Sequence, residues 1–186
     1  MTLFNFIQSH KELIKSEEIV FFGGSFNPWH RGHKACLELM GRNKKIIVIP
    51  DHNPLKDLSK TNFTDLSKIK SDTIELNQDI YIYDKFFKAQ VKNPTSKWIQ
   101  ELKESGLTQK LSILMGFDSF LSLGKWIEYD YLLKNLDTIY IVNRLNESEA
   151  SKDHKSLCLE YSNLNLVFLG KHEFEIISST EIRKSL

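Results

Sequence analysis

Residues 19–33 constrain the fold more than any other stretch, and they read Ile-Val-Phe-Phe-Gly-Gly-Ser-Phe-Asn-Pro-Trp-His-Arg-Gly-His. The opening apolar run predicts a buried strand. Gly23 and Gly24 then allow the backbone to turn sharply and to approach a ligand closely. Pro28 ends the extended segment and favours entry into a helix that we expect to run to Met40. The N–H groups and dipole at the start of such a helix attract phosphate.

His30 and His33 are three residues apart, so they lie on the same face of the first helical turn. We expect their ring N–H groups to reach one anion at the helix start, beside Ser25 and Phe26 of the glycine turn. The alternative is that both are ordinary polar residues on a helix surface. A pair of histidines placed directly behind a strand and a glycine turn favours anion binding.

This segment resembles the nucleotidyltransferases that carry a His-x-Gly-His signature, in which two histidines stabilise a transferring nucleotidyl phosphate. Within that group, Gly-Gly-Ser-Phe-Asn-Pro-x-His-x-Gly-His is most similar to the nicotinate or nicotinamide mononucleotide adenylyltransferases. The signature alone does not separate these enzymes from pantetheine-phosphate adenylyltransferases or cytidylyltransferases. The rest of the chain has to make that distinction.

A second motif lies near the other end of the chain, where residues 177–183 read Ile-Ser-Ser-Thr-Glu-Ile-Arg. Ser178, Ser179 and Thr180 ahead of an acidic and an apolar residue are typical of a helix start. Hydroxyl and N–H donors there, with Arg183 one turn further on, would clamp a polyphosphate. Capping explains the serines but not the whole string. The adenylyltransferases carry Ile-Ser-Ser-Thr-x-Ile-Arg at the same relative place, which implies that it binds the triphosphate.

A strand predicted over residues 111–115 leads into the third candidate segment. Gly116 lets the backbone approach a ligand, and Asp118 is placed to accept ribose hydroxyls, although an Asp helix cap is the alternative. Residues 116–133 resemble the Gly-x-Asp…Trp segment of the adenylyltransferases. The resemblance implies that Trp126 stacks on the pyridine ring, whereas a tryptophan is as often plain core.

Three further residues are candidates on less evidence. Lys56 lies in a polar loop after the strand predicted over residues 44–50, where open α/β sheets bind ligands, and it either contacts a phosphate or is solvated. Thr95 starts a helix where relatives have Tyr-Thr-x-Asp, although its neighbours depart from that pattern. Arg144 follows the strand predicted over residues 137–142, and it either binds a substrate carboxylate or phosphate bidentately or is solvated.

Predicted strands alternate with helices along the whole chain. This alternation indicates a Rossmann-like α/β fold, with a parallel sheet, helices on both faces and the site at the carboxyl ends of the strands. The 186 residues suit a single nucleotidyltransferase domain. Apolar residues at helical spacing predict one amphipathic helix over residues 2–16. The chain thus divides into an N-terminal helix (1–16) and a Rossmann-like core (17–186).

Composition argues against several other classes of protein. A net charge of +1 gives no overall footprint for nucleic acid or for an anionic membrane. No apolar stretch approaches the length of a membrane span, and the first 18 residues lack a signal-type core. Cys36 and Cys158 are far apart in sequence, so we expect reduced thiols. These features predict a cytoplasmic location.

The motifs together predict an adenylyltransferase of pyridine dinucleotide synthesis. The 5′-phosphate of the mononucleotide attacks the α-phosphorus of ATP, and pyrophosphate leaves. His30 and His33 are assigned to the α-phosphate, and Arg183 with residues 178–180 to the β- and γ-phosphates. We expect Mg²⁺ to bridge the phosphates, held mostly by them and by water, without a metal site built from the protein.

Two alternatives stay open at this point. One is another small nucleotidyltransferase, with phosphopantetheine or a phospho-alcohol as acceptor. The other is a nucleotide-binding sensor without turnover, which the altered segment at residues 94–98 and the short chain after Arg183 keep in play. The sequence does not distinguish nicotinate from nicotinamide mononucleotide, and it leaves open whether the chain forms a homo-oligomer.

Overall fold

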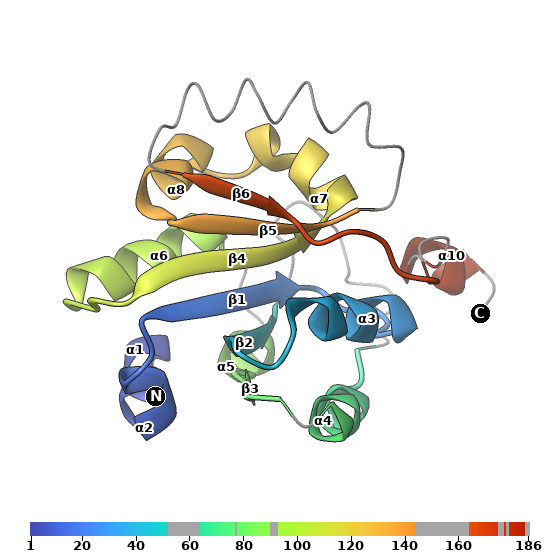
Figure 1. Ribbon diagram of the computed structural model, residues 1–186, viewed down its shortest axis with the longest axis horizontal. Helices are drawn as coiled ribbons and strands as arrows, with labels where there is room; N and C mark the ends of the chain where they lie inside the picture. The colour runs from blue at the N-terminus through green and yellow to red at the C-terminus, as the bar shows by residue number, and fades with distance from the viewer. Residues whose placement is uncertain are drawn as a thin grey trace.

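A computed structural model describes residues 1–51, 64–76, 78–89, 93–143, 164–174, 177 and 179–184. Its centre is a six-stranded sheet with the strand order β3-β2-β1-β4-β5-β6 (Figure 1). All five neighbouring pairs are parallel, which confirms the predicted Rossmann-like α/β fold. The strands are β1 (Glu18–Gly24), β2 (Lys45–Pro50), β3 (Ile80–Ile82), β4 (Lys110–Gly116), β5 (Thr138–Val142) and β6 (Asn165–Phe168).

The central strands are buried on both faces, as their unbroken apolar runs predict for a parallel sheet. Phe21 of β1 is aligned with Ile47 of β2 on one side and with Ile113 of β4 on the other. The order of the strands reverses at this β1–β4 pair. In open parallel sheets, ligands bind beyond the carboxyl ends of the strands at such a reversal.

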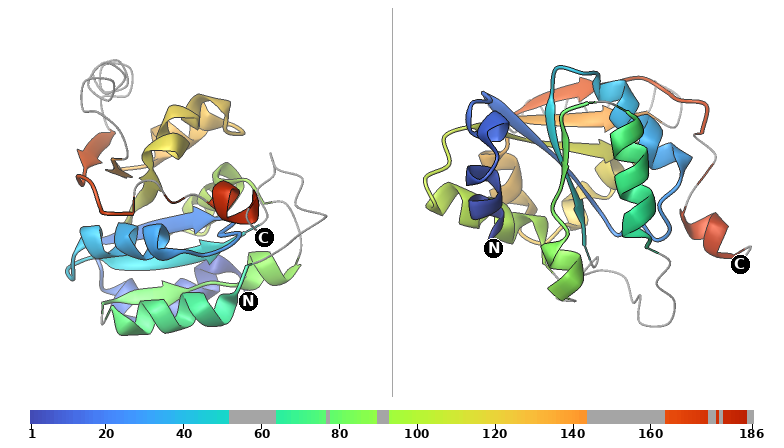
Figure 2. Two further views of the ribbon diagram at one scale, coloured as in Figure 1. Left: turned by 90° about the vertical axis from the view of Figure 1, so that its right-hand side faces the viewer. Right: turned by 90° about the horizontal axis from the view of Figure 1, so that it is seen from below.

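Helices cover both faces of the sheet, as the views from the end and from below show (Figure 2). On one face, the larger core packs between the sheet and α1 (Leu3–Gln8), α2 (Lys11–Ile14), α5 (Lys85–Ala89), α6 (Thr95–Glu104), α7 (Phe117–Leu121), the short 3₁₀ helix η1 (Leu123–Lys125) and α8 (Tyr129–Asn135). The other face carries α3 (Arg31–Met40) and α4 (Leu66–Glu75). Helix α10 (Ser179–Lys184) lies beyond the carboxyl ends of the strands, near α3 (Figure 1).

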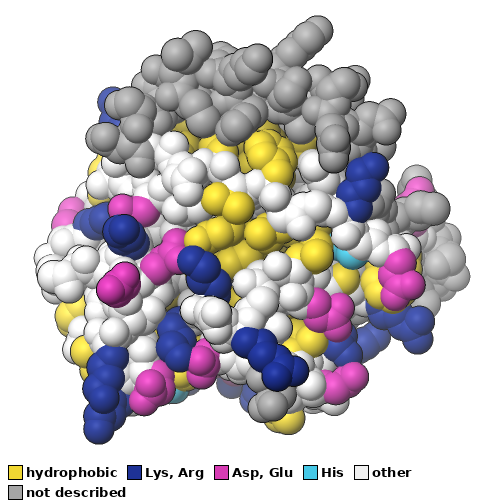
Figure 3. Space-filling model, in the orientation of Figure 1, with side chains coloured by type: hydrophobic (Ala, Val, Ile, Leu, Met, Phe, Trp, Pro, Cys, Tyr) yellow, Lys and Arg dark blue, Asp and Glu magenta, His cyan; other side chains and the backbone are white. Residues whose placement is uncertain are grey.

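Among the described residues, the face that carries α3 shows no charge field of a single sign (Figure 3). Lysines, arginines and acidic residues are interspersed there around a hydrophobic centre (Figure 3). Within the described residues, no helix has the length and hydropathy needed to cross a membrane.

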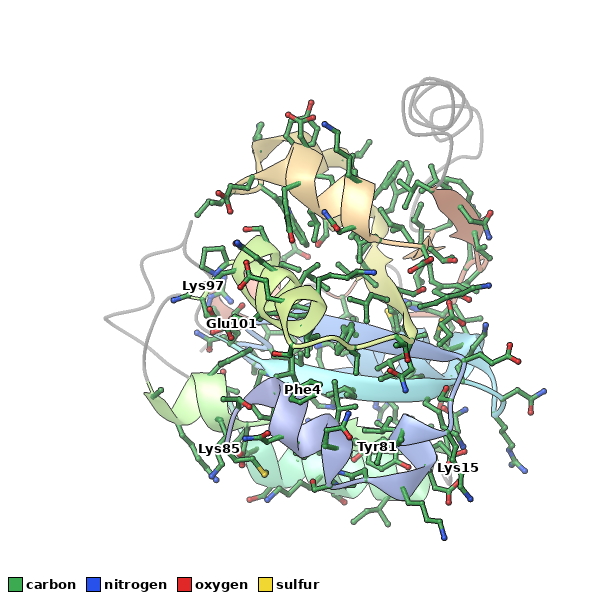
Figure 4. The ribbon with its side chains drawn as sticks, turned by 90° about the vertical axis from the view of Figure 1, so that its left-hand side faces the viewer. Phe4, Lys15, Tyr81, Lys85, Lys97 and Glu101 are labelled. Carbon is green, nitrogen blue, oxygen red and sulfur yellow. The ribbon has the colours of Figure 1, made fainter. Side chains whose placement is uncertain are left out.

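The N-terminal segment differs from the prediction, because two short helices replace the single helix expected over residues 2–16. The Ser9 hydroxyl donates to the carbonyl of Phe6 at 2.7 Å, and Nδ1 of His10 donates to the same carbonyl at 2.8 Å. These side chains compete with the backbone for the carbonyl that a continuing helix would use. The pair still packs on the core, with Phe4 between α1 and α6 and Tyr81 beside α2 (Figure 4).

A polar cluster lies at the amino end of the sheet, opposite the carboxyl ends of the strands. The Glu18 carboxylate accepts from the Lys44 ammonium and the Ser112 hydroxyl, both at 2.6 Å, and from the Tyr140 hydroxyl at 3.1 Å. Burial alone would raise the pKa of the Glu18 carboxyl. The hydrogen bonds from Lys44 and Ser112 outweigh burial and hold this pKa below its ordinary value of 4.5.

This cluster predicts an acid-dependent share of the stability. Because the pKa of Glu18 is lower in the folded state, its carboxylate stabilises the fold above pH 4.5, and this contribution is lost as the pH falls through the lowered folded value. We expect Glu18→Gln to reduce the free energy of unfolding by about 1–3 kcal/mol at neutral pH and to flatten its decline in acid. Urea denaturation at about pH 7 and about pH 3.5 measures both effects. Parallel pH curves for variant and wild type would contradict the account.

Candidate active site

A cavity of about 490 Å³ lies at the carboxyl ends of β1 and β4, where the strand order reverses. Its walls come from the turn after β1, the first turns of α3, the start of α6, the α7–η1 segment, and the chain leading into α10. Segments that are distant in sequence therefore meet around one space. The cavity therefore lies where the sequence predicts the site, at the carboxyl ends of the strands.

The alternation of side chains along the strands divides the cavity into two halves. Phe21, Ile113 and Met115 face the side of α6 and α7, where they belong to the larger core. Phe22 and Leu114 face the side of α3. We call the side of α6 and α7, with Phe21, Ile113 and Met115, the aromatic half of the cavity. The side of α3, with Phe22 and Leu114, is the histidine half.

In the histidine half, the two predicted histidines form the start of α3 itself. His30 is the N-cap, and its Nδ1 accepts the N–H of Gly32 at 3.2 Å. Nδ1 of His33 accepts the N–H of His30 at 3.2 Å, which completes a reciprocal capping box. The two rings stack with their centroids 3.8 Å apart. Both histidines line the cavity, and His30 is 5% exposed, whereas their binding of an anion stays a prediction.

These hydrogen bonds decide which ring nitrogen carries the proton. A nitrogen that accepts a backbone N–H has no proton, so each neutral ring is protonated on Nε2. His30 and His33 therefore each bring a ring N–H donor to the cavity wall. Two such donors beside a helix start suit a phosphate oxygen.

The glycines of the first motif have steric reasons that the structure makes visible. A Cβ on Gly24 would lie 2.9 Å from the ring of Phe26. The backbone of Phe26 itself has a positive φ of 43°. A Cβ on Gly32 would lie 3.0 Å from the ring of His30. Each glycine thus lets an aromatic ring of the motif sit directly on the backbone. Gly23 has open space at this position and also lines the cavity, as does Ser25.

The aromatic half contains most of the candidates from the middle of the chain. Thr95, Gly116, Asp118 and Trp126 all line the cavity. Trp126 is partly buried against the larger core, so it is both a packing residue and a wall of the cavity. Asp118 is exposed in the first turn of α7, where Gly116 is the N-cap residue.

The chain into α10 returns to the first motif. The Ser179 hydroxyl donates to the carbonyl of Pro28 at 3.0 Å, and the Arg183 guanidinium donates to the carbonyl of Asn27 and, at 3.1 Å, to the Thr180 hydroxyl. Ser179 and Thr180 line the cavity, whereas Arg183 is not among its lining residues. The binding of phosphate by Arg183 therefore stays a prediction. Lys56, Arg144, Ser178 and Cys158 lie outside the described residues.

Two cavity residues had no motif to point to them. Trp98 follows Thr95 by one helical turn, is 3% exposed, and packs edge-on against Phe21 at 4.9 Å. His172 lies in the chain before α10, and its Nδ1 accepts the N–H of Phe174 at 3.0 Å, so its neutral ring is also protonated on Nε2. The residues around Trp98 and His172 in the sequence form no recognisable motif. Only the fold brings these two side chains to the cavity.

The hydrogen bonds predict ring tautomers that NMR can read. At alkaline pH, where imidazole is neutral, we expect the Nε2–H tautomer for His30, His33 and His172. His10 serves as the control, because its Nδ1 faces the Phe6 carbonyl, which can only accept, and requires the Nδ1–H tautomer. Long-range ¹H–¹⁵N correlation of the histidine rings measures each form. A protonated Nδ1 on His30 or His33 would contradict the capping geometry.

Comparison with known proteins places this geometry in a family. Residues 21–185 match the model of the cytidylyltransferase-like proteins. The chain is 30% identical to a probable nicotinate-nucleotide adenylyltransferase of Fusobacterium nucleatum, over 91% of this chain and 87% of that protein. It is 29% identical to a second protein of that name, from Leptospira interrogans, over 88% and 82% of the two chains.

Among solved structures, the fold is similar to that of a Plasmodium falciparum nicotinic acid mononucleotide adenylyltransferase complexed with NaAD. The TM-score is 0.66 over 91% of this chain and 83% of the other. At 20% sequence identity, this likeness supports the fold alone.

Proposed function

We propose that this chain, which belongs to the cytidylyltransferase-like family, is an adenylyltransferase that transfers AMP from ATP to nicotinate mononucleotide. The observation that carries the proposal is the pair of cavity-lining histidines whose Nδ1 atoms both accept backbone N–H groups, in a cavity whose other half is lined by tryptophans. The choice of nicotinate over nicotinamide rests on the names of the relatives.

The reaction needs no nucleophile from the protein. A phosphate oxygen of the mononucleotide attacks the α-phosphorus of ATP in line, a new P–O bond forms, and the bond to the β-phosphate oxygen breaks to release pyrophosphate. The attacking oxygen is already an anion. Catalysis then consists of positioning the two nucleotides and stabilising the charge on the oxygens of the transferring group.

We assign the α-phosphate to the two histidines. Their rings are fixed by the hydrogen bonds that start α3, so the donors need little reorganisation when charge develops. His30 is 5% exposed, and an N–H donor acts more strongly on an anion in such a shielded setting than in water. His172 supplies a third imidazole ring to the lining of the cavity.

We assign the departing pyrophosphate to the start of α10. Ser179 and Thr180 line the cavity there, and Ser178 and Arg183 complete the motif. Arg183 supports this arrangement through its hydrogen bond to the Asn27 carbonyl, which ties α10 to the segment leading into the histidines. Lys56 and Arg144 stay predictions, as contacts to a phosphate or to the substrate carboxylate.

We assign the pyridine ring to the aromatic half of the cavity. Trp126 offers a flat face to an electron-poor ring, and Trp98 and Thr95 line the same space. Asp118 and Gly116 stand at the end of β4, where a nucleotide ribose and the backbone can meet, and residues 23–26 bind the nucleotide on the side of β1.

Mg²⁺ enters this proposal as part of the substrate MgATP. The ion is commonly held in nucleotide sites by phosphate oxygens and water, with few protein ligands. In the part of the chain that the structure describes, no group of three or more His, Cys, Asp or Glu side chains could hold a metal by itself.

The test of the function is turnover. Purified protein is incubated with MgATP and either nicotinate or nicotinamide mononucleotide, and dinucleotide and pyrophosphate are followed by chromatography. We expect both products in equal amounts, with the larger kcat/KM for the nicotinate form. Binding of ATP without either product would overturn the proposal. A parallel incubation offers phosphopantetheine as the acceptor, and a larger kcat/KM with it would assign the chain to that different acceptor.

The histidine assignment predicts the behaviour of His33→Ala. Loss of one preorganised donor should lower kcat by roughly a hundredfold or more. His10→Ala is the matched control, because His10 lies on the N-terminal helices away from the cavity, and its kcat should not change. Circular dichroism confirms that each variant is folded. An unchanged kcat in folded His33→Ala would remove the histidines from the mechanism.

The assignment of the pyridine ring predicts a different pattern for Trp126→Ala. Removal of the flat wall should raise KM for the mononucleotide by about tenfold and leave KM for ATP nearly unchanged. Trp126→Phe, which keeps an aromatic face, should recover most of the loss. A rise confined to KM for ATP would move Trp126 to the adenine side.

A further inference from the structure

Trp29 lies inside the first motif but outside the cavity. Its side chain is 2% exposed, and its indole ring stacks on the ring of His33 with a centroid distance of 5.1 Å and an interplanar angle of 28°. The His33 ring also stacks on the ring of His30, with a centroid distance of 3.8 Å. Phe26 meets both Trp29 and His33 edge-on, at 5.0 Å and 5.1 Å. The His33 ring thus packs among the rings of Trp29, His30 and Phe26.

The indole has one polar atom, and it is bound to a different helix. Nε1 of Trp29 donates to Oδ2 of Asp72 at 2.8 Å, across 43 residues of sequence. Asp72 belongs to α4, which lies beside α3 (Figure 2). A buried indole N–H needs an acceptor, and an ionised carboxylate makes the stronger kind of bond. This hydrogen bond therefore fixes the rotation of the indole about its side-chain torsions.

We propose that Asp72 is a positioning residue for nucleotidyl transfer, acting through Trp29 on the ring of His33. This inference rests on the proposed function. The carboxylate holds the indole, the indole holds one face of the His33 imidazole, and the stack continues to His30. Neither Asp72 nor Trp29 lines the cavity, so we expect both residues to act without touching the nucleotides. Instead, Asp72 and Trp29 set the direction in which the Nε2–H donors point. The rate of transfer is sensitive to that orientation.

The same helix offers a matched control. Glu75, one turn after Asp72, pairs with Lys34 of α3 at 2.8 Å. This ion pair also links α4 to α3, and Lys34 is the residue next to His33. A residue that merely docks α4 on α3 would behave like Glu75, whereas a positioning residue would not.

The experiment compares Asp72→Ala, Asp72→Asn and Glu75→Ala by steady-state kinetics and thermal unfolding. We expect Asp72→Ala to lower kcat by roughly tenfold and to leave both KM values within about twofold, because ground-state binding is intact. Asp72→Asn keeps an acceptor oxygen and should stay within about threefold of wild-type kcat. Glu75→Ala should keep wild-type kcat.

Four results would overturn the proposal. They are an unchanged kcat in Asp72→Ala, a loss that appears only in KM, an equal loss in Glu75→Ala, and a loss in Asp72→Asn as large as in Asp72→Ala. Trp29→Phe adds a further arm, because it keeps a ring and removes the donor. Once that donor is gone, adding Asp72→Ala should cause no further loss of kcat, and independent multiplication of the two losses would contradict the chain of contacts.

Failure of the proposed function itself is separable from failure of this inference. If wild-type protein gives no turnover, the proposed function is overturned, and NMR of the histidine rings then decides the positioning role. Ring signals of His33, assigned by comparison with His33→Ala, should shift in Asp72→Ala and stay in place in Glu75→Ala. Unshifted His33 signals in Asp72→Ala would overturn the inference without reference to activity.

Discussion

The capping of α3 by two imidazoles is the interaction on which the rest of the site depends. A serine or aspartate at the N-cap would satisfy the N–H of Gly32 that His30 satisfies here, but it would bring no ring N–H donor. Here Nδ1 of each histidine accepts a backbone N–H, and this leaves the proton on Nε2. The hydrogen bonds that start the helix thus also prepare its anion-binding donors. Folding of α3 and formation of the site are one event.

The site is completed by the opposite end of the chain. The carbonyls of Asn27 and Pro28, just before the histidines, accept from Arg183 and Ser179 of α10. The two most informative motifs of the sequence are therefore in direct contact, about 150 residues apart along the chain. Because α10 docks on backbone groups, its position depends on the path of the turn after β1. Two contacts hold this turn: the ring of Phe26 packs on Gly24, and the indole of Trp29 donates a hydrogen bond to Asp72 of α4.

The features that the sequence predicted correctly are those that local patterns of residues determine. Apolar runs located the parallel strands, and two motifs located the helix starts that line the cavity. The prediction of a single N-terminal helix was wrong, because there side chains compete with the backbone. The helical spacing of apolar residues continues across Ser9 and His10, but both of these side chains donate hydrogen bonds to the Phe6 carbonyl, and α1 ends before them. The sequence patterns missed Trp98, His172 and the Trp29–Asp72 bond for a different reason. Each depends on which elements become neighbours, and a one-dimensional pattern does not record that.

The most direct test of the account is a crystal structure with a non-hydrolysable ATP analogue and nicotinate mononucleotide bound together. If the two histidines bind the transferring group, Nε2 of His30 and of His33 will both lie within hydrogen-bond distance, about 3 Å, of non-bridging oxygens of the α-phosphate. The account also predicts that the pyridine ring lies on Trp126 and that the outer phosphates lie at the start of α10. An α-phosphate outside the reach of both rings, or a nucleotide bound at another face of the sheet, would contradict the central claim.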